Sequence, residues 1–314
     1  MAIFEIGILG RVTWNLHSMN NEGTVGNVTE PRTVVLADGE KTDGISGEML
    51  KHIHAYNVWL LQEDKGQFCQ ACQKFHPQKA DMNPLIQGKD TPEKAMETAI
   101  SSCILCDLHG FLVQRPAVAR PSTVEFGWTL GLPEKTHREI HIHARHSMVG
   151  RSREEAEEKQ AGEETVERQV PAQMIYHRPT RSGVYAIVSV FQPWRIGLNE
   201  VDYTYTIDDE KRKNRYQLAM NAYKATFMRT DGAMTSTRFP HVEAMEGVVV
   251  TSETNFPVPT ISPLKDGFVE EMESLVTKQR GLSHQKFSNL AELCDIINAL
   301  ANKDIFRLGM PGAK

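Results

Sequence analysis

The sequence predicts an α+β fold, in which strands and helices are interspersed without forming regular βα units. Strand-like runs with β-branched or alternating residues occur at 3–17, 108–130, 182–191 and 247–251. Helical spacing of apolar residues marks four further stretches, at about 47–61, 209–228, 265–278 and 288–301. The order of these runs argues against a doubly wound parallel sheet. With 314 residues and 40% hydrophobic residues, the chain can bury a large core.

The N-terminal third predicts a strand, a loop, a second strand and a helix. The strand at 3–17 leads into a polar loop at 18–27, and a short strand follows at 33–36. Ser46 is a good N-cap for the helix at about 47–61. We expect the helix to bury its periodic apolar side chains, which are Met49, Leu50, Ile53, Tyr56 and Leu60.

Two stretches differ from the rest of the chain. Residues 62–102 are polar, contain three prolines, and begin and end at cysteine pairs, which predicts an insertion with a short helix opening at Thr91-Pro92. Residues 133–172 predict a long exposed hairpin: 138–149 alternate like one strand, and 173–176 could form the returning strand. Between them, 151–169 carry seven Glu and four Lys/Arg, a pattern typical of a solvated tip.

The C-terminal part predicts two further amphipathic helices. Asp208 or Asp209 can cap the helix at about 209–228, and Ser288 can cap a last helix that ends near 301. Both have one apolar face, formed by Tyr216, Ala219, Met220, Tyr223 and Phe227 in the first and by Leu290, Leu293, Ile297 and Leu300 in the second.

Composition and charge narrow the class of protein. No apolar run approaches the ~18–20 residues that cross a bilayer, and the N-terminus resembles no signal peptide. We therefore expect a cytoplasmic protein with no membrane partner. The formal net charge of −5 argues only weakly against a nucleic-acid binder, because only the contacting face matters. Residues 211–229 carry six Lys/Arg and no acid, a basic face that fits RNA or solvent equally well.

Four of the five cysteines form two pairs, Cys69 with Cys72 and Cys103 with Cys106. Two such CxxC pairs can surround one tetrahedral zinc ion, which would be a structural site. The alternative is four unrelated reduced thiols, and the 30-residue gap between the pairs is long for a zinc ribbon. Cys294 lies in an apolar helical pattern and is expected to be a small core residue.

A second metal hypothesis rests on His141, His143 and His146. Their HxHxxH spacing resembles the HxHxDH segment of metallo-β-lactamase-like hydrolases, but Arg145 takes the place of the aspartate. A metal-dependent hydrolase is thus one alternative function, and a zinc-ribbon regulator that reads DNA is another. The sequence contains no GxGxxG that opens a helix, no GxxxxGK[ST] and no GxSxG.

Four segments, taken in order, resemble one known family. They are RVTWNLHSMN at 11–20, SGEMLKH at 46–52, DLHGFL at 107–112 and the turn that ends at Arg238. The chain resembles the repeated backbone subunit of the CRISPR Cascade effector, DevR branch, as found in type I-A and I-B systems.

The resemblance implies a modified RNA-recognition-motif (ferredoxin-like) palm with a finger insertion and a thumb hairpin. The palm would comprise 1–61, 106–132 and 173–314, the finger 62–105 and the thumb 133–172. It also implies partners: copies of the subunit along a CRISPR guide RNA, other Cascade subunits, and target DNA through the guide, in antiviral defence. No catalysis is expected, because 18–32 hold no aspartate like the one that cuts RNA in related type III subunits.

Candidate RNA contacts follow from the resemblance and from side-chain chemistry. Neutral side chains could hydrogen-bond phosphate or ribose, cations could neutralise phosphate, and the start of the first helix is a ready anion site. Backbone contacts should dominate, since guide sequence must not matter. The candidates are Asn15, His17, Ser18, Asn20, Asn27, Arg32, Ser46, Gly47, Lys51 and Arg238.

Overall fold

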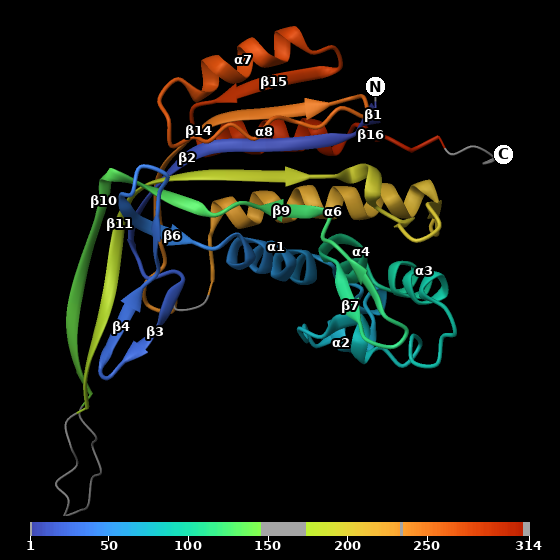
Figure 1. Cartoon of the computed structure of the whole chain (residues 1–314), viewed down its shortest axis with the longest axis horizontal. Helices are drawn as coiled ribbons and strands as arrows, with labels where there is room; N and C mark the ends of the chain where they lie inside the picture. The colour runs from blue at the N-terminus through green and yellow to red at the C-terminus, as the bar shows by residue number, and fades with distance from the viewer. Residues whose placement is uncertain (1, 146–173, 233–234, 310–314) are drawn as a thin grey trace, which may run out of the picture.

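The computed structural model describes residues 2–145, 174–232 and 235–309. Its centre is a largely antiparallel sheet with the strand order β15-β14-β2-β11-β10-β6-β5 (Figure 1). In that order the strands are Leu282–Phe287, His241–Ser252, Glu5–His17, Met174–Phe191, Thr129–Arg145, Lys41–Ile45 and Thr33–Val35. The mixed architecture with antiparallel pairing confirms the predicted α+β class at this level.

Shorter strands complete the described sheets. β3 (Asn21–Val25) and β4 (Val28–Pro31) form a hairpin beside β11, and β9 (Val124–Phe126) pairs with the far end of β11. Three two-stranded pairs lie outside the large sheet: β1 (Ala2–Ile3) with β16 (Asp304–Ile305), β7 (Phe111–Val113) with β8 (Val118–Arg120), and β12 (Leu198–Asn199) with β13 (Thr204–Tyr205).

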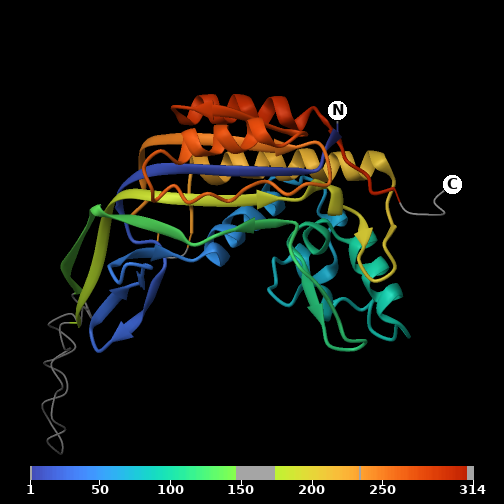
Figure 2. The same ribbon diagram turned by 45° about the horizontal axis from the view of Figure 1, so that its top comes forward.

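Helices cover both faces of the sheet (Figures 1 and 2). Helices α1 (Gly47–Leu61), α6 (Asp209–Met228) and α8 (Leu290–Ala301) share the main core with Ile6 and Ile8 of β2. Helix α7 (Phe268–Lys278) packs on the opposite face, where Leu9 lies. Alternation along β2 thus feeds two cores, as the two-residue period of a strand requires.

The stretch between α1 and β7 is mostly helical. It contains α2 (Gln70–Gln73), α3 (Pro92–Ser102) and α4 (Ile104–His109), and it lies away from the large sheet in Figure 1. Strands β10 and β11 extend past the sheet as a long hairpin, paired out to Arg145 and Met174 (Figure 1). A bulge in β10 between Gly131 and Thr136 marks where this hairpin leaves the sheet, since bulges bend strands.

Several element predictions are confirmed. Ser46 caps α1 by accepting a hydrogen bond from the Met49 amide, and Asp208 caps α6 in the same way from Lys211. The apolar face predicted for α6 is buried in full. In α8, Leu293, Ile297 and Leu300 are buried and Leu290 is partly buried.

Others are corrected. The predicted loop at 18–27 contains β3 and the turn of the β3–β4 hairpin, whose polar residues hide its strand character. Asn289 rather than Ser288 caps α8, while Glu292 accepts a hydrogen bond from the Ser288 amide just before the cap. In α1, Tyr56 and Leu60 are exposed, because Ile53, His54 and Val58 form the buried face instead. Strand β15 was not predicted.

No helix of the described residues is long and apolar enough to cross a membrane.

Candidate nucleic-acid interface and metal centre

The four paired cysteines meet in one cluster, as the metal hypothesis requires. The Sγ atoms of Cys69, Cys72, Cys103 and Cys106 all lie within 4.8 Å of one another, and all four residues are buried. The Cys72 and Cys106 sulfur atoms are 3.9 Å apart. Two thiolates on one tetrahedral Zn²⁺ lie about 3.8 Å apart when each Zn–S bond is about 2.3 Å, so the cluster fits that geometry.

Local structure explains why the pairs converge. Cys69 is the N-cap of α2 and Cys103 is the N-cap of α4, so each CxxC spans the first turn of a helix. The pairs therefore sit at helix starts rather than on the β-ribbon that the zinc-ribbon alternative needs.

The structure places two of the predicted RNA-contact side chains of the first strand inside the protein. His17 is fully buried, with its Nε2 atom 2.9 Å from the Tyr185 hydroxyl, and burial holds its pKa well below the usual value. Ser18 is also buried and donates to the Pro179 carbonyl. Neither side chain reaches the surface. Asn15 remains part-exposed and donates to Glu243.

The start of α1 gathers three predicted residues but is closed. The Asn20 side chain accepts from the Ser46 amide at 2.6 Å, and Ser46 is itself buried. A Cβ atom on Gly47 would lie 1.9 Å from the Phe126 carbonyl oxygen. The helix start, where Ser46 and Gly47 are predicted to bind an anion, thus packs against the strand backbone.

Four predicted residues lie apart from that helix start. Asn27 is exposed in the β3–β4 turn, and Arg32 pairs with Glu22 at 2.7 Å. Lys51 lies 3.7 Å from Glu125. Arg238 follows a loop whose Gly232 packs against Met49 and Ile53, and because two helical residues span about 200°, that side of α1 faces away from Lys51.

The basic stretch at 211–229 has a structural role in part. Arg212 and Arg215 are buried, and Arg215 donates to Asp107 at 2.7 Å. Lys224 donates to Asn298 of α8. The aromatic residues of α6 are core residues, so this helix offers no stacking platform for bases.

Comparison with known proteins decides the family. A family model described as "CRISPR-associated negative auto-regulator DevR/Csa2" matches residues 8–273. The chain belongs to this family. No curated protein sequence matches this DevR/Csa2-family chain significantly.

Two solved structures resemble the DevR/Csa2-family chain in fold. A chain of a "CRISPR RNA-guided surveillance complex" is 11% identical, with a TM-score of 0.52 over 95% of this chain and 98% of that one. A chain of a "CRISPR RNA-guided surveillance complex, pre-nicking" is 13% identical, with a TM-score of 0.47 over 81% and 78%. The first supports a shared fold.

The long hairpin of this DevR/Csa2-family chain has two unlike faces. His141 and His143 lie on one face of β10, and His141 contacts Thr180 at 2.8 Å. On the other face Ile140, Ile142 and Ile175 are 54%, 70% and 43% exposed. We call these three residues the isoleucine stripe.

The hydrolase alternative gains no support. Its histidines lie on an exposed strand, and His146 falls outside the described residues, as do 151–169. Among the residues that the structure describes, the four cysteines are the one group able to hold a metal ion.

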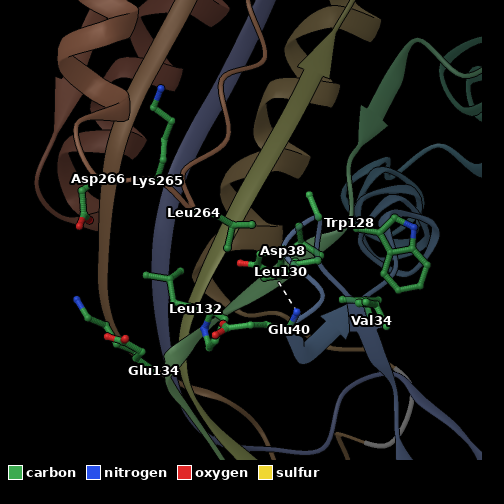
Figure 3. A pocket seen from close by; sticks show the side chains of 15 residues that line it. Val34, Asp38, Glu40, Trp128, Leu130, Leu132, Glu134, Leu264, Lys265 and Asp266 are labelled. Atoms are coloured by element: carbon green, nitrogen blue, oxygen red, sulfur yellow. Dashed lines mark hydrogen bonds between the residues drawn. The ribbon is translucent and has the colours of Figure 1, made fainter.

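An apolar groove of about 880 Å³ opens at the base of the same hairpin (Figure 3). Its apolar lining includes Val34, Trp128, Leu130, Leu132 and Leu264. Trp128 is 46% exposed. No described side chain fills the groove, so it can accept an apolar group from another molecule.

Sequence reasoning missed a charged cavity at the base of the hairpin. A cavity of about 300 Å³ brings together Lys41, Arg138 and Arg181. These residues come from three strands and belong to no motif. No signal in the sequence joins them, because only the pairing of β6, β10 and β11 places them side by side.

A buried histidine pair makes stability depend on pH. The His54 Nε2 atom lies 3.0 Å from the Ala219 carbonyl oxygen, its Nδ1 atom lies 3.1 Å from the His109 Nε2 atom, and burial lowers the pKa of His54 to about 3. The unfolded chain binds this proton below about pH 6.5, so stability is present above that pH and falls on acidification toward pH 3.

We expect protonation of His54 in the unfolded chain to lower the free energy of unfolding by about 1 kcal/mol between pH 6.5 and 5.5. Burial also lowers the pKa values of His109 and His17, so both act in the same direction. Urea unfolding at pH 7.5, 6.5 and 5.5 measures this. His54→Gln keeps a donor for Ala219 and should flatten the pH slope by about one histidine's share. Equal stability at all three pH values would contradict the assignment.

Proposed function

We propose that this chain is a non-catalytic, guide-RNA-binding subunit of a type I CRISPR surveillance complex. The family match over residues 8–273 carries the proposal, and the fold similarity to a chain of an RNA-guided surveillance complex supports it. In this proposal the sheet with α1, α6 and α8 is the RNA-recognition-motif-like palm, 62–105 is the finger and 133–172 is the thumb. Other subunits of the complex, and target DNA through the guide, are the further partners.

Contacts to the guide are proposed for residues that remain accessible. Asn27 and Asn15 could donate hydrogen bonds, while Arg32, Lys51 and Arg238 could neutralise phosphates. Two of these cations already have carboxylate neighbours, Glu22 and Glu125. Phosphate would have to compete with those carboxylates, and each phosphate that a cation neutralises makes binding weaker at higher salt.

Two apolar surfaces on one chain support the proposal that copies of it assemble. The isoleucine stripe lies out along the hairpin, and the apolar groove lies at its base, beginning at Leu132. A stripe that docks into the groove of a second copy makes a head-to-tail contact, which repeats along an open filament unless a rotation closes it. Such a filament suits a subunit that repeats along an RNA.

Assembly on RNA is the experiment for this function. We expect the chain to co-purify with heterogeneous small RNA and, on addition of a guide-length RNA, to form particles of several copies in analytical ultracentrifugation. The Ile140→Asp/Ile142→Asp variant should still bind RNA but sediment as much smaller species, because charge opposes apolar docking. Leu112→Asp, at an apolar side chain that is 64% exposed elsewhere, is the control and should assemble normally.

Two results would overturn the proposal. Protein that stays monomeric and RNA-free with guide RNA present would remove the function. Preferential binding to duplex DNA from its own promoter would instead favour the regulator named in the family description.

We further propose that the cysteine cluster holds one structural zinc ion. Cys69, Cys72, Cys103 and Cys106 would supply all four ligands, leaving no position for substrate. The ion would tie α2 to α4 in a stretch that has few strands of its own. Zinc would therefore set the shape of the finger rather than take part in chemistry.

A further inference from the structure

The cavity at the base of the hairpin has more cations than acids in its lining. Lys41 of β6, Arg138 of β10 and Arg181 of β11 line it, with Asp43 as its one acidic residue. Counting three cations against one carboxylate gives the lining a charge of +2 with His137 neutral. Its volume of about 300 Å³ suits a phosphate group with its adjoining atoms rather than a large ligand.

The carboxylate is already committed to other partners. The Asp43 Oδ1 atom accepts from Arg181 at 2.6 Å, and its Oδ2 atom accepts from the Tyr185 hydroxyl at 2.8 Å. Burial raises the pKa of Asp43, against the opposing effect of Arg181. Asp43 therefore neutralises at most one of the three cations.

Arg181 forms a fixed wall of the cavity. Its side chain is 1% exposed, its guanidinium also reaches Asn21 at 3.5 Å, and its Nε atom has no hydrogen-bond partner among the described residues. Because its charge is paired with Asp43, Arg181 gives the cavity a fixed wall, and the net positive charge of the lining comes from Lys41 and Arg138.

Lys41 and Arg138 are the accessible cations. Both are exposed, and neither forms an ion pair within 4.0 Å among the described residues. The hydroxyl groups of Thr42 and Thr136 donate to the Gly131 and Leu132 carbonyls. Because these two threonine hydroxyl groups already donate to carbonyls, a ligand would be bound by the charges of Lys41 and Arg138.

We propose that this cavity binds a backbone phosphodiester of single-stranded RNA, with Lys41 and Arg138 as the contacting cations. The inference rests on the proposed RNA-binding function and adds a subsite to it. Apart from the imidazole of His137 the lining carries no aromatic ring for a base to stack on, and its other members are threonines, one proline and charged side chains. Recognition is therefore of the backbone and independent of sequence.

The test compares two double variants that each remove two positive charges. Lys41→Gln/Arg138→Gln alters the cavity. Lys278→Gln/Arg280→Gln alters exposed residues near α7 and β15, at the other end of the strand order. Fluorescence anisotropy of a labelled 30-nucleotide RNA of mixed sequence, titrated at several KCl concentrations, gives the affinity and its salt slope.

The cavity variant should bind more weakly, with a salt slope smaller by about 1.4, because each phosphate contact on a single strand contributes about 0.7. Between 50 and 200 mM KCl that difference amounts to about seven-fold in affinity. The control variant should keep the wild-type slope. Identical slopes for both variants, with wild-type RNA binding intact, would overturn the subsite alone, whereas a wild-type chain that binds no RNA would overturn the proposed function with it.

Inorganic phosphate separates a nucleic-acid subsite from a small-anion site. At matched ionic strength it should displace RNA no better than chloride. Phosphate-specific displacement that disappears in the cavity variant would reassign the cavity to free phosphate and overturn the proposal.

Discussion

Replacing Cys69 and Cys103 by serine is expected to lower the zinc content of the purified chain from one ion to less than a tenth of an ion. One cysteine is lost from each helix start, so the two remaining sulfur atoms cannot complete a tetrahedral site. We expect the free energy of unfolding to fall by about 4–5 kcal/mol or more, since loss of a structural metal is among the few changes of that size.

Elemental analysis by mass spectrometry and urea unfolding measure the two effects. Cys294→Ser is the matched control: Cys294 lies in α8, outside the cluster, and should leave zinc in place. His143→Ala should also leave it in place. Zinc that survives the double serine variant but is lost with His143→Ala would contradict the cysteine site and revive the hydrolase alternative. Limited proteolysis of the serine variant should cut first within 62–109.

Asp107→Asn should be the most damaging single substitution in the described core. Asp107 is fully buried and accepts from Arg120 at 2.8 Å, from Arg215 at 2.7 Å and from the Gly197 amide at 3.0 Å. The change keeps the side-chain shape but leaves two buried guanidinium groups without their shared carboxylate. We expect a loss of about 3–5 kcal/mol, the usual cost of removing one partner from a buried ion pair.

Urea unfolding of Asp107→Asn against Asp266→Asn tests this. Asp266 also pairs with an arginine, at 2.9 Å from Arg11, but its side chain is 97% exposed. An exposed pair contributes about 0–1 kcal/mol, so the control should differ little from wild type. A loss below about 1 kcal/mol in Asp107→Asn would show that the buried network does not stabilise the chain as proposed.

The buried network around Asp107 also gives the DLHGFL segment at 107–112 a role that needs no contact with RNA. Asp107 joins α4 to α6 through Arg215 and to β8 through Arg120. Gly110 has a positive φ of 65°, and a Cβ atom there would lie 2.2 Å from the Arg120 carbonyl oxygen. Glycine is required by that close approach. In this chain the segment therefore has a structural role, which its buried contacts account for.

The sequence by itself determined the elements whose signal is local. Ser46 and Asp208 marked helix starts, because an N-cap bonds a backbone amide two or three residues away. The spacing of the two CxxC pairs predicted that the four cysteines meet, since two intervening residues let both sulfur atoms of a pair face one ion. The family followed from four short segments in order. Strand β15 and the β3–β4 hairpin were not predicted, because their mixed polar residues show no clear two-residue period.

Only the tertiary structure decided which polar residues are accessible. His17 and Ser18 look like ligands in sequence but are buried, and Arg212 and Arg215 look like a basic face but bond inside the core. Lys41, Arg138 and Arg181 lie on three strands and meet only because β6, β10 and β11 pair. Burial and long-range pairing depend on the whole chain, and no local pattern records them, so the charged cavity at the hairpin base could not be predicted from the sequence.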